Sequence, residues 1–244
     1  VVTDQQQRFV TGLAADDFAV FEDGVEQNVS FFATQQVPLD LALLLDTSAS
    51  MHDKIDTMQQ AAVGFLETLR SGDRTMIVDI KDNVRISHPL GSDFPQAHAA
   101  VRKTLARGGT SLYNGLYLTI KEMVKQRKAN GDVRRQAIAV LSDGEDTASL
   151  VGYDDVMELA KQSGIMIYTI TLKSAFAIRQ ASLSGRRYFS EAEFSMKSLA
   201  QETGARSFFP NTIEELSGVY GVIAAELANQ YAIGVIRLER IKKG

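Results

Sequence analysis

The chain has 244 residues, 45% hydrophobic and 23% charged, a composition that predicts one globular domain of roughly 200 residues with flanking elements. Its net charge of −4 without a basic block argues against nucleic acid as a partner, and the absence of cysteine excludes disulfides and thiolate chemistry. No apolar run approaches the roughly 20 residues of a membrane-spanning helix, so we expect no direct membrane insertion.

The first 36 residues differ from the rest of the chain in their sequence pattern. Val10–Leu13, Phe18–Phe21 and Val29–Phe32 are short β-prone pieces separated by turn signals. We therefore predict a small β-rich appendage over residues 1–36, ahead of a main domain over residues 37–230. Residues 231–244 are expected to form a terminal strand and extension.

Strand-like and helix-like patterns alternate along the main domain. The expected elements in chain order are strand 39–45, helix 53–69, strands 75–80 and 84–87, helices 93–105 and 111–128, strand 137–141, helix 153–162, strand 165–172, helix 191–202, strand 207–209, helix 213–228 and a last strand near 231–236. This alternation predicts an α/β fold with a doubly wound, mostly parallel sheet between two layers of helices. The connection before residues 84–87 is too short for a parallel crossover, so that strand should be an antiparallel edge strand.

Oxygen-bearing side chains gather where the strands of this sheet should end. Asp46, Ser48 and Ser50 follow the first strand, Asp143 follows strand 137–141, and Thr110 precedes a helix. Ligands of open α/β sheets bind outside the carboxyl ends of the strands. Two carboxylates and three hydroxyls are hard donors that suit Mg²⁺, Mn²⁺ or Ca²⁺. The sequence therefore predicts a divalent-cation site at this edge.

The same five residues resemble the complete metal-ion-dependent adhesion site of von Willebrand factor type A domains, and the resemblance covers roughly residues 38–231. It implies that Ser48 and Ser50 bind the metal directly and that Asp46 acts mostly through water. It further implies that Thr110 and Asp143 exchange direct and water-mediated roles as the site opens or closes around a ligand.

Further phrases resemble a bacterial branch of this family known mainly from Acidobacteria-type genomes, whose members carry a β segment ahead of the domain. These segments are Val10–Leu13, Asp17-Phe18, Phe21–Gly24, Gly108–Tyr113, Leu141–Asp146 and Ala200–Arg206. Asn114 departs from the branch, which often has aspartate there. It lies one helical turn past Thr110, so we expect only an indirect effect on the site.

Other residues are weaker candidates for ligand contact. His52 lies beside the serine loop. Glu145, like its neighbour Asp146, can either orient metal-bound water or cap the helix region that follows. The segment 173–190 should emerge near the metal and either recognises an acidic or aromatic partner or is a solvated excursion. Its candidate contacts are Arg179, Arg186, Arg187 and Tyr188.

Together these features predict a metal-dependent binding or adhesion module and not an enzyme. The cation would capture an exposed Asp or Glu of a partner protein, and we expect a secreted, extracytoplasmic or cell-surface location. One alternative is an intracellular, chelatase-like assembly subunit that works with a separate ATPase. Another is metal-assisted hydrolysis, against which stands the lack of a histidine or lysine positioned as its general base.

Overall fold

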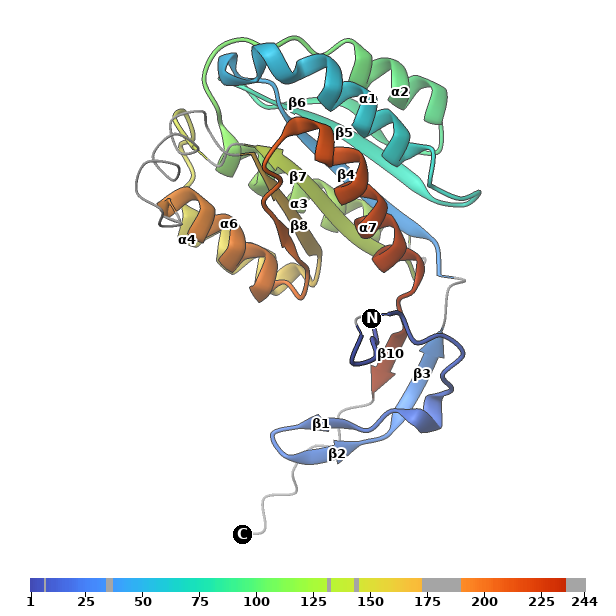
Figure 1. Cartoon of the computed structure of the whole chain (residues 1–244). Helices are drawn as coiled ribbons and strands as arrows, with labels where there is room; N and C mark the ends of the chain where they lie inside the picture. The colour runs from blue at the N-terminus through green and yellow to red at the C-terminus, as the bar shows by residue number, and fades with distance from the viewer. Residues whose placement is uncertain (7, 34–36, 131–132, 143–144, 173–189, 236–244) are drawn as a thin grey trace. The chain divides into compact units, whose positions relative to one another are not determined.

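The computed structural model describes the chain except for residues 7, 34–36, 131–132, 143–144, 173–189 and 236–244 (Figure 1). The chain divides into two compact units. Residues 38–222 form the larger unit, and residues 1–37 together with 223–244 form the smaller one. No helix in the described ranges has the length and apolar character needed to cross a bilayer.

A six-stranded sheet forms the centre of the larger unit, in the order β6-β5-β4-β7-β8-β9. The strands are β4 (Leu39–Asp46), β5 (Arg74–Ile80), β6 (Arg85–Gly91), β7 (Arg135–Ser142), β8 (Met166–Thr171) and β9 (Ser207–Phe208). All neighbouring pairs are parallel except β5 and β6, which run antiparallel at one edge. The predicted doubly wound α/β sheet and its antiparallel edge strand are therefore confirmed.

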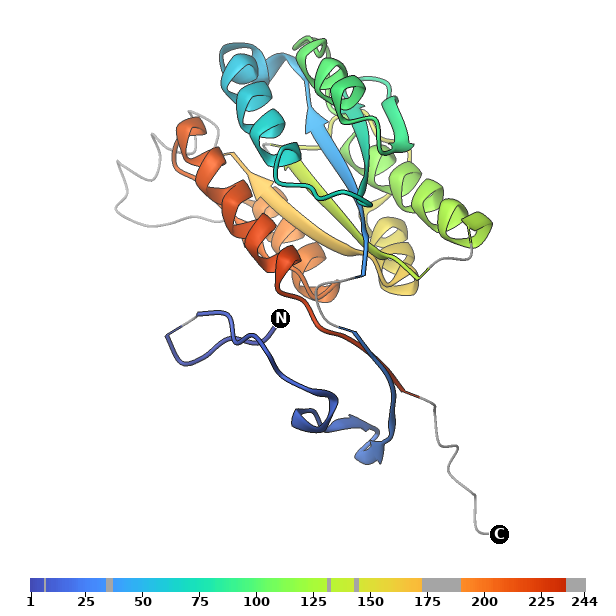
Figure 2. The same ribbon diagram turned by 90° about the vertical axis from the view of Figure 1, so that its right-hand side faces the viewer.

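Helices cover both faces of this sheet (Figures 1 and 2). They are α1 (Ile55–Leu66), α2 (Phe94–Arg102), α3 (Leu112–Asn130), α4 (Tyr153–Ser163), α6 (Glu191–Glu202) and α7 (Leu216–Ala228), with 3₁₀ turns η2 (Ala49–Lys54) and η3 (Ile213–Glu215). α1 and α2 pack together on one face, and α3, α4 and α6 share a core cluster on the other. On the first face, Phe65 of α1 stacks on Tyr220 of α7 with ring centroids 4.7 Å apart.

The central strands are buried along almost their whole length. All eight residues of β4 are buried, as are seven of the eight in β7. Strands covered on both faces lose the polar alternation of half-exposed strands, which explains their continuous apolar runs. Each fully buried Leu contributes roughly 1.5–3 kcal/mol, so β4 is a rigid support for the residues at its end.

A charged cluster closes the opposite, amino-terminal end of β4. Asp40 is fully buried and accepts two hydrogen bonds from the Arg74 guanidinium, at 2.8 and 2.7 Å. Arg134 Nε donates to the same carboxylate at 2.6 Å. The buried carboxylate is thus paired with two guanidinium groups, the arrangement that a charge needs when it leaves water.

The strands that the structure describes in the smaller unit form two pairs. β1 (Val20–Glu22) and β2 (Val25–Gln27) form a hairpin, and β3 (Val29–Ala33) pairs antiparallel with β10 (Ala232–Val235). The rings of Phe18, Phe32 and Tyr231 lie 5.3 to 5.9 Å apart. The amino-terminal β segment and the last strand therefore share one apolar cluster.

Two predictions of secondary structure were wrong, one for a strand and one for the ends of a helix. Val10–Leu13 is irregular and not a strand: Gly12 has φ +81°, and the Tyr231 hydroxyl donates to Val10 O and accepts from Leu13 N. The helix expected over residues 53–69 begins with η2, and α1 ends at Leu66. The Thr68 hydroxyl donates to Phe65 O at 2.7 Å, a local side-chain bond that competes with further helix.

Candidate metal centre

Asp46 is the last residue of β4 and lies fully buried at the carboxyl edge of the sheet. Its Oδ1 accepts a hydrogen bond from Ser48 N at 2.9 Å, and its Oδ2 accepts one from the Ser142 hydroxyl at 2.6 Å. Ser142 ends the neighbouring parallel strand β7. Parallel pairing therefore brings two strand ends together and fixes the orientation of the carboxylate.

The two serines follow directly: Ser48 lies just before η2, and Ser50 is the second residue of η2. The bond from Ser48 N to Asp46 is an Asx-type turn, which folds the chain back over the strand end. Ser48 is 3% exposed, Ser50 is exposed, and their hydroxyl oxygens lie 2.9 Å apart. The Asp-x-Ser-x-Ser spacing thus places one buried carboxylate and a pair of hydroxyls in a single turn.

A second loop lies against this turn and carries Thr110. Ala49 N donates to Gly108 O at 3.0 Å, and Arg107 N donates to Thr47 O at 2.8 Å. Gly108 has φ +74°, and a Cβ there would overlap the Asp82 carboxylate, so the loop requires glycine. Backbone bonds between the two loops, and not sequence proximity, bring Thr110 to the end of β4.

Thr110 itself is held by the loop that follows β7. Its N–H donates to the Thr147 hydroxyl at 2.9 Å, and its carbonyl accepts from Thr147 N and Ala148 N. Thr110 is 4% exposed. Three loops, after β4, before α3 and after β7, therefore meet at one edge of the sheet.

Asp146 caps a helix, although not the helix expected. Its Oδ1 accepts from Leu112 N at 2.8 Å and from the Ser149 hydroxyl at 2.7 Å. It thus satisfies the first turn of α3, which precedes it in the chain, whereas the sequence suggested a helix that follows it. The Ser111 hydroxyl, directly before α3, donates to Asp82 O at 2.9 Å.

Asn114 ties the same two segments together. Its Oδ1 accepts hydrogen bonds from Leu150 N and Val151 N, both at 3.1 Å. Its own N–H donates to the Ser149 hydroxyl. The side-chain oxygen of Asn114 therefore holds the loop after β7 by its backbone N–H groups.

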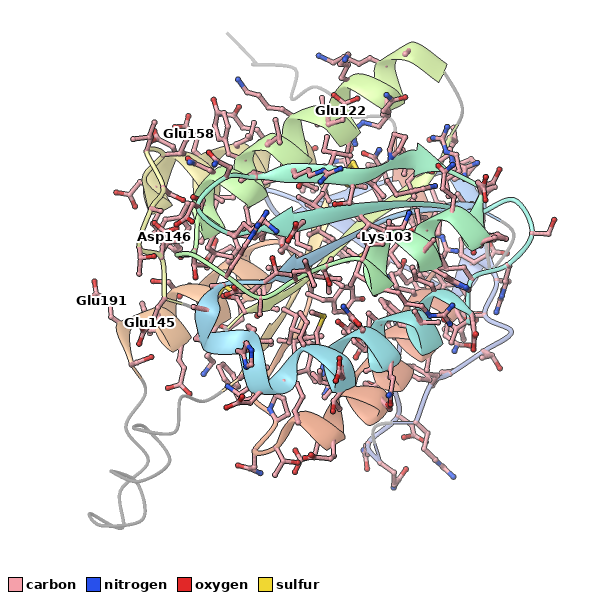
Figure 3. All side chains as sticks on the ribbon, turned by 90° about the horizontal axis from the view of Figure 1, so that it is seen from above. Lys103, Glu122, Glu145, Asp146, Glu158 and Glu191 are labelled. Atoms are coloured by element: carbon pink, nitrogen blue, oxygen red, sulfur yellow. The ribbon has the colours of Figure 1, made fainter. Side chains whose placement is uncertain are left out.

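Of the remaining candidate residues, the structure describes only His52 and Glu145. His52 and Glu145 are exposed, and His52 Nδ1 lies 3.1 Å from the carboxylate of its neighbour Asp53. Figure 3 shows Glu145 close to Asp146 at the rim of the larger unit. Outside the described residues lie Asp143, Arg179, Arg186, Arg187 and Tyr188.

The donor set fits a hard divalent cation. The structure places the Asp46 carboxylate and the hydroxyls of Ser48, Ser50 and Thr110 on loops that contact one another, and all four are oxygen donors. No group of three or more His, Cys, Asp or Glu that could hold a metal occurs within the described ranges. Oxygen donors suit Mg²⁺, Mn²⁺ or Ca²⁺ better than zinc, which favours nitrogen and sulfur ligands.

Sequence reasoning missed several supporting residues. Ser142 and Thr147 hold Asp46 and Thr110 directly, and the Thr47 hydroxyl donates to the buried carboxylate of Asp79. A hydroxyl or carboxylate at a strand end was the available signal for Ser142 and Asp79. Thr147 lies in an irregular loop and gave no comparable signal.

Comparison with known proteins shows which family part of the chain is similar to. Residues 41–145 match the sequence profile of the von Willebrand factor type A domain. Residues 41–145, from strand β4 to the start of the loop after β7, are therefore similar to a von Willebrand factor type A domain.

Individual relatives extend the likeness. An uncharacterized protein of Synechocystis sp. is 30% identical over 115 residues, which are 46% of this chain and 26% of that protein. The chain spans about a quarter or less of the curated relatives it matches.

Two solved structures share the fold at low identity. A von Willebrand factor type A protein from Catenulispora acidiphila has TM-score 0.62 and 14% identity, over 85% of this chain and 52% of that one. The corresponding domain of the type V pili tip protein Mfa5 from Porphyromonas gingivalis has TM-score 0.59 and 12% identity, over 78% and 95%.

Proposed function

We propose that this chain is a protein-binding or adhesion module in which a divalent cation at the end of β4 captures an acidic side chain of a partner. The observation that carries the proposal is the turn of Asp46, Ser48 and Ser50, with its buried carboxylate and hydroxyl pair. The fold shared with a pilus-tip protein supports an adhesive role in an extracytoplasmic or surface location.

Each residue has a definite task in this proposal. Ser48 and Ser50 offer neutral oxygens directly, and Thr110 offers a third from the facing loop. Asp46 is already engaged by Ser48 N and Ser142, so it suits a role through bound water. The resemblance adds Asp143 as the second carboxylate. When bound, the cation supplies an electrophilic centre that mostly uncharged ligands leave able to attract a carboxylate.

We further propose that the module is not an enzyme. A hydrolase would need a general base within reach of a metal-bound water. His52 is exposed and next to Asp53, and Tyr113, at the start of α3, is not a base at neutral pH. Burial, with the nearby charge of Asp146, raises the pKa of Tyr113 above its ordinary value.

Calorimetric titration with MgCl₂ and MnCl₂, with and without a glutamate-containing peptide, tests the proposal. We expect saturable uptake with a Kd of about 10⁻⁴–10⁻³ M, the range of extracellular calcium modules. The double substitution Ser48→Ala/Ser50→Ala should abolish uptake. The matched double substitution Ser71→Ala/Ser92→Ala, at exposed serines outside the site, should not change it.

Peptide capture separates metal binding from adhesion. Retention of the glutamate peptide should require the cation, end on addition of EDTA, and be absent for the same peptide with glutamine. The proposal is wrong if the intact protein takes up neither metal at millimolar concentration with the glutamate peptide present.

A further inference from the structure

A cavity of about 320 Å³ lies between α2, the loop that follows it, and the antiparallel pair β5–β6. It is built by elements distant in sequence, because α2 packs on both of these strands. Figure 3 shows Lys103, which follows α2 directly, well apart from Glu145 and Asp146 at the rim of the candidate metal centre. The volume is at the lower end of the range typical of small-molecule pockets.

Cations dominate the lining of this cavity, which contrasts with the net charge of −4 of the whole chain. The charged residues that line it are Lys81, Arg85, Lys103, Arg107 and a single acid, Asp79. Lys81 and Asp79 form an ion pair at 2.6 Å, with side chains 16% and 6% exposed. This pair makes a largely buried, neutral floor.

The other three cations surround that floor without counter-ions. Arg85, Lys103 and Arg107 are exposed, and their side chains make no ion pair or hydrogen bond with any part of the chain that the structure describes. Lys103 lies at the carboxyl end of α2, where the helix dipole favours a cation. That dipole accounts for neither Arg85, on the edge strand, nor Arg107, in the loop before α3.

Like charges held together around one cavity repel each other, so the arrangement costs folding free energy unless an anion occupies it. Two guanidinium groups suit bidentate contacts with tetrahedral oxyanions, and an ammonium group adds a point charge. The buried Thr104 also lines the cavity. We propose that this cavity binds a small soluble polyanion that carries phosphate groups, at a site separate from the cation centre.

The site is connected to the candidate metal centre through the chain. Asp79, in its floor, accepts the hydrogen bond from the Thr47 hydroxyl, and Arg107 N donates to Thr47 O. Thr47 lies between Asp46 and Ser48. The test must therefore separate an anion bound in the cavity from one bound through a cation at Ser48 and Ser50.

Calorimetric titration of the full chain with pyrophosphate, at low ionic strength and in EDTA, makes this separation. We expect saturable binding of one pyrophosphate, no saturable binding of acetate, and weaker affinity as salt is raised. The double substitution Lys103→Gln/Arg107→Gln should weaken binding about tenfold or more, because two charge-assisted contacts are lost. Ser48→Ala/Ser50→Ala should leave binding unchanged.

The control is Arg102→Gln/Lys128→Gln, which removes the same charge at exposed positions outside the cavity. Its affinity for pyrophosphate should fall clearly less than that of the cavity variant, since neither of these two side chains lines the cavity. Absence of saturable pyrophosphate binding would overturn the proposal. So would an equal loss in control and cavity variants, or equal binding of acetate. None of these outcomes bears on cation uptake at Ser48 and Ser50.

Discussion

The two ends of strand β4 each hold a fully buried aspartate, and the chain treats them in opposite ways. Asp40, at the start, is gripped by the guanidinium groups of Arg74 and Arg134. Asp46, at the end, accepts hydrogen bonds from a backbone N–H and a serine hydroxyl. The Asp40 carboxylate is neutralised by two cations. The Asp46 carboxylate is instead oriented by neutral donors, at an edge of the sheet where three loops meet.

Under the proposed function, this difference in hydrogen-bond donors separates the structural charge of Asp40 from the cation-binding charge of Asp46, which burial does not. Both aspartates lie on one strand at 0% exposure, so exposure alone does not distinguish them. The two carboxylates differ in their hydrogen-bond donors. Guanidinium groups neutralise Asp40, whereas a backbone N–H and a serine hydroxyl orient Asp46. Four predictions would break or sharpen this contrast.

The largest effect is expected at the amino-terminal end. Asp40→Ala should lower the free energy of unfolding by about 3–5 kcal/mol, because it leaves two partly buried guanidinium groups without their carboxylate. Urea unfolding followed by circular dichroism measures this. Asp46→Asn, measured in EDTA, should cost about 1 kcal/mol or less, since the amide oxygen can still accept from Ser48 N. Equal losses for the two variants would remove the contrast.

The next effect concerns magnesium and should fall on the opposite end of the strand. At about ten times the Kd, Mg²⁺ should raise the free energy of unfolding by about 1.4 kcal/mol. Asp46→Asn should lose this increment, and Asp40→Asn should retain it if it folds. Unfolding curves with MgCl₂ and with EDTA give both numbers, and an increment that survives in Asp46→Asn would place the cation elsewhere.

The sheet and the residues at the end of β4 were predicted from the sequence, whereas the partners of Asp40 and Asp146 were not. Continuous apolar runs and helical periodicity located the sheet, and strand ends marked Asp46, Ser48 and Ser50. The role of Asp40 was not predicted, because its arginine partners lie 34 and 94 residues away and only the folded sheet brings them together. The partners of Asp146 were missed for the same reason: a capping side chain supplied from 34 residues away has no local signature.

The third prediction concerns this contact between Asp146 and the start of α3. Asp146→Ala should cost about 1 kcal/mol, because Leu112 N and Tyr113 N lose the acceptor at the start of α3. Asp146→Asn keeps an oxygen in place and should cost less. Urea unfolding of both variants measures the difference. If Asp146 instead acts mainly on metal-bound water, Asp146→Ala would lower Mg²⁺ affinity while the stability in EDTA stays unchanged.

The smallest effect is expected for Asn114→Asp, which adds a charge close to Asp146. Asn114→Asp retains the oxygen that accepts from Leu150 N and Val151 N, and an acid in the first turn of α3 favours the helix dipole. Repulsion from Asp146 opposes that gain, so the free energy of unfolding should change by less than about 0.5 kcal/mol. Asn114→Leu loses the acceptor and should cost about 1–3 kcal/mol. A matching loss in Asn114→Asp would show that the loop after β7 requires a neutral side chain there, and would extend the preference for uncharged groups beyond the donors around Asp46.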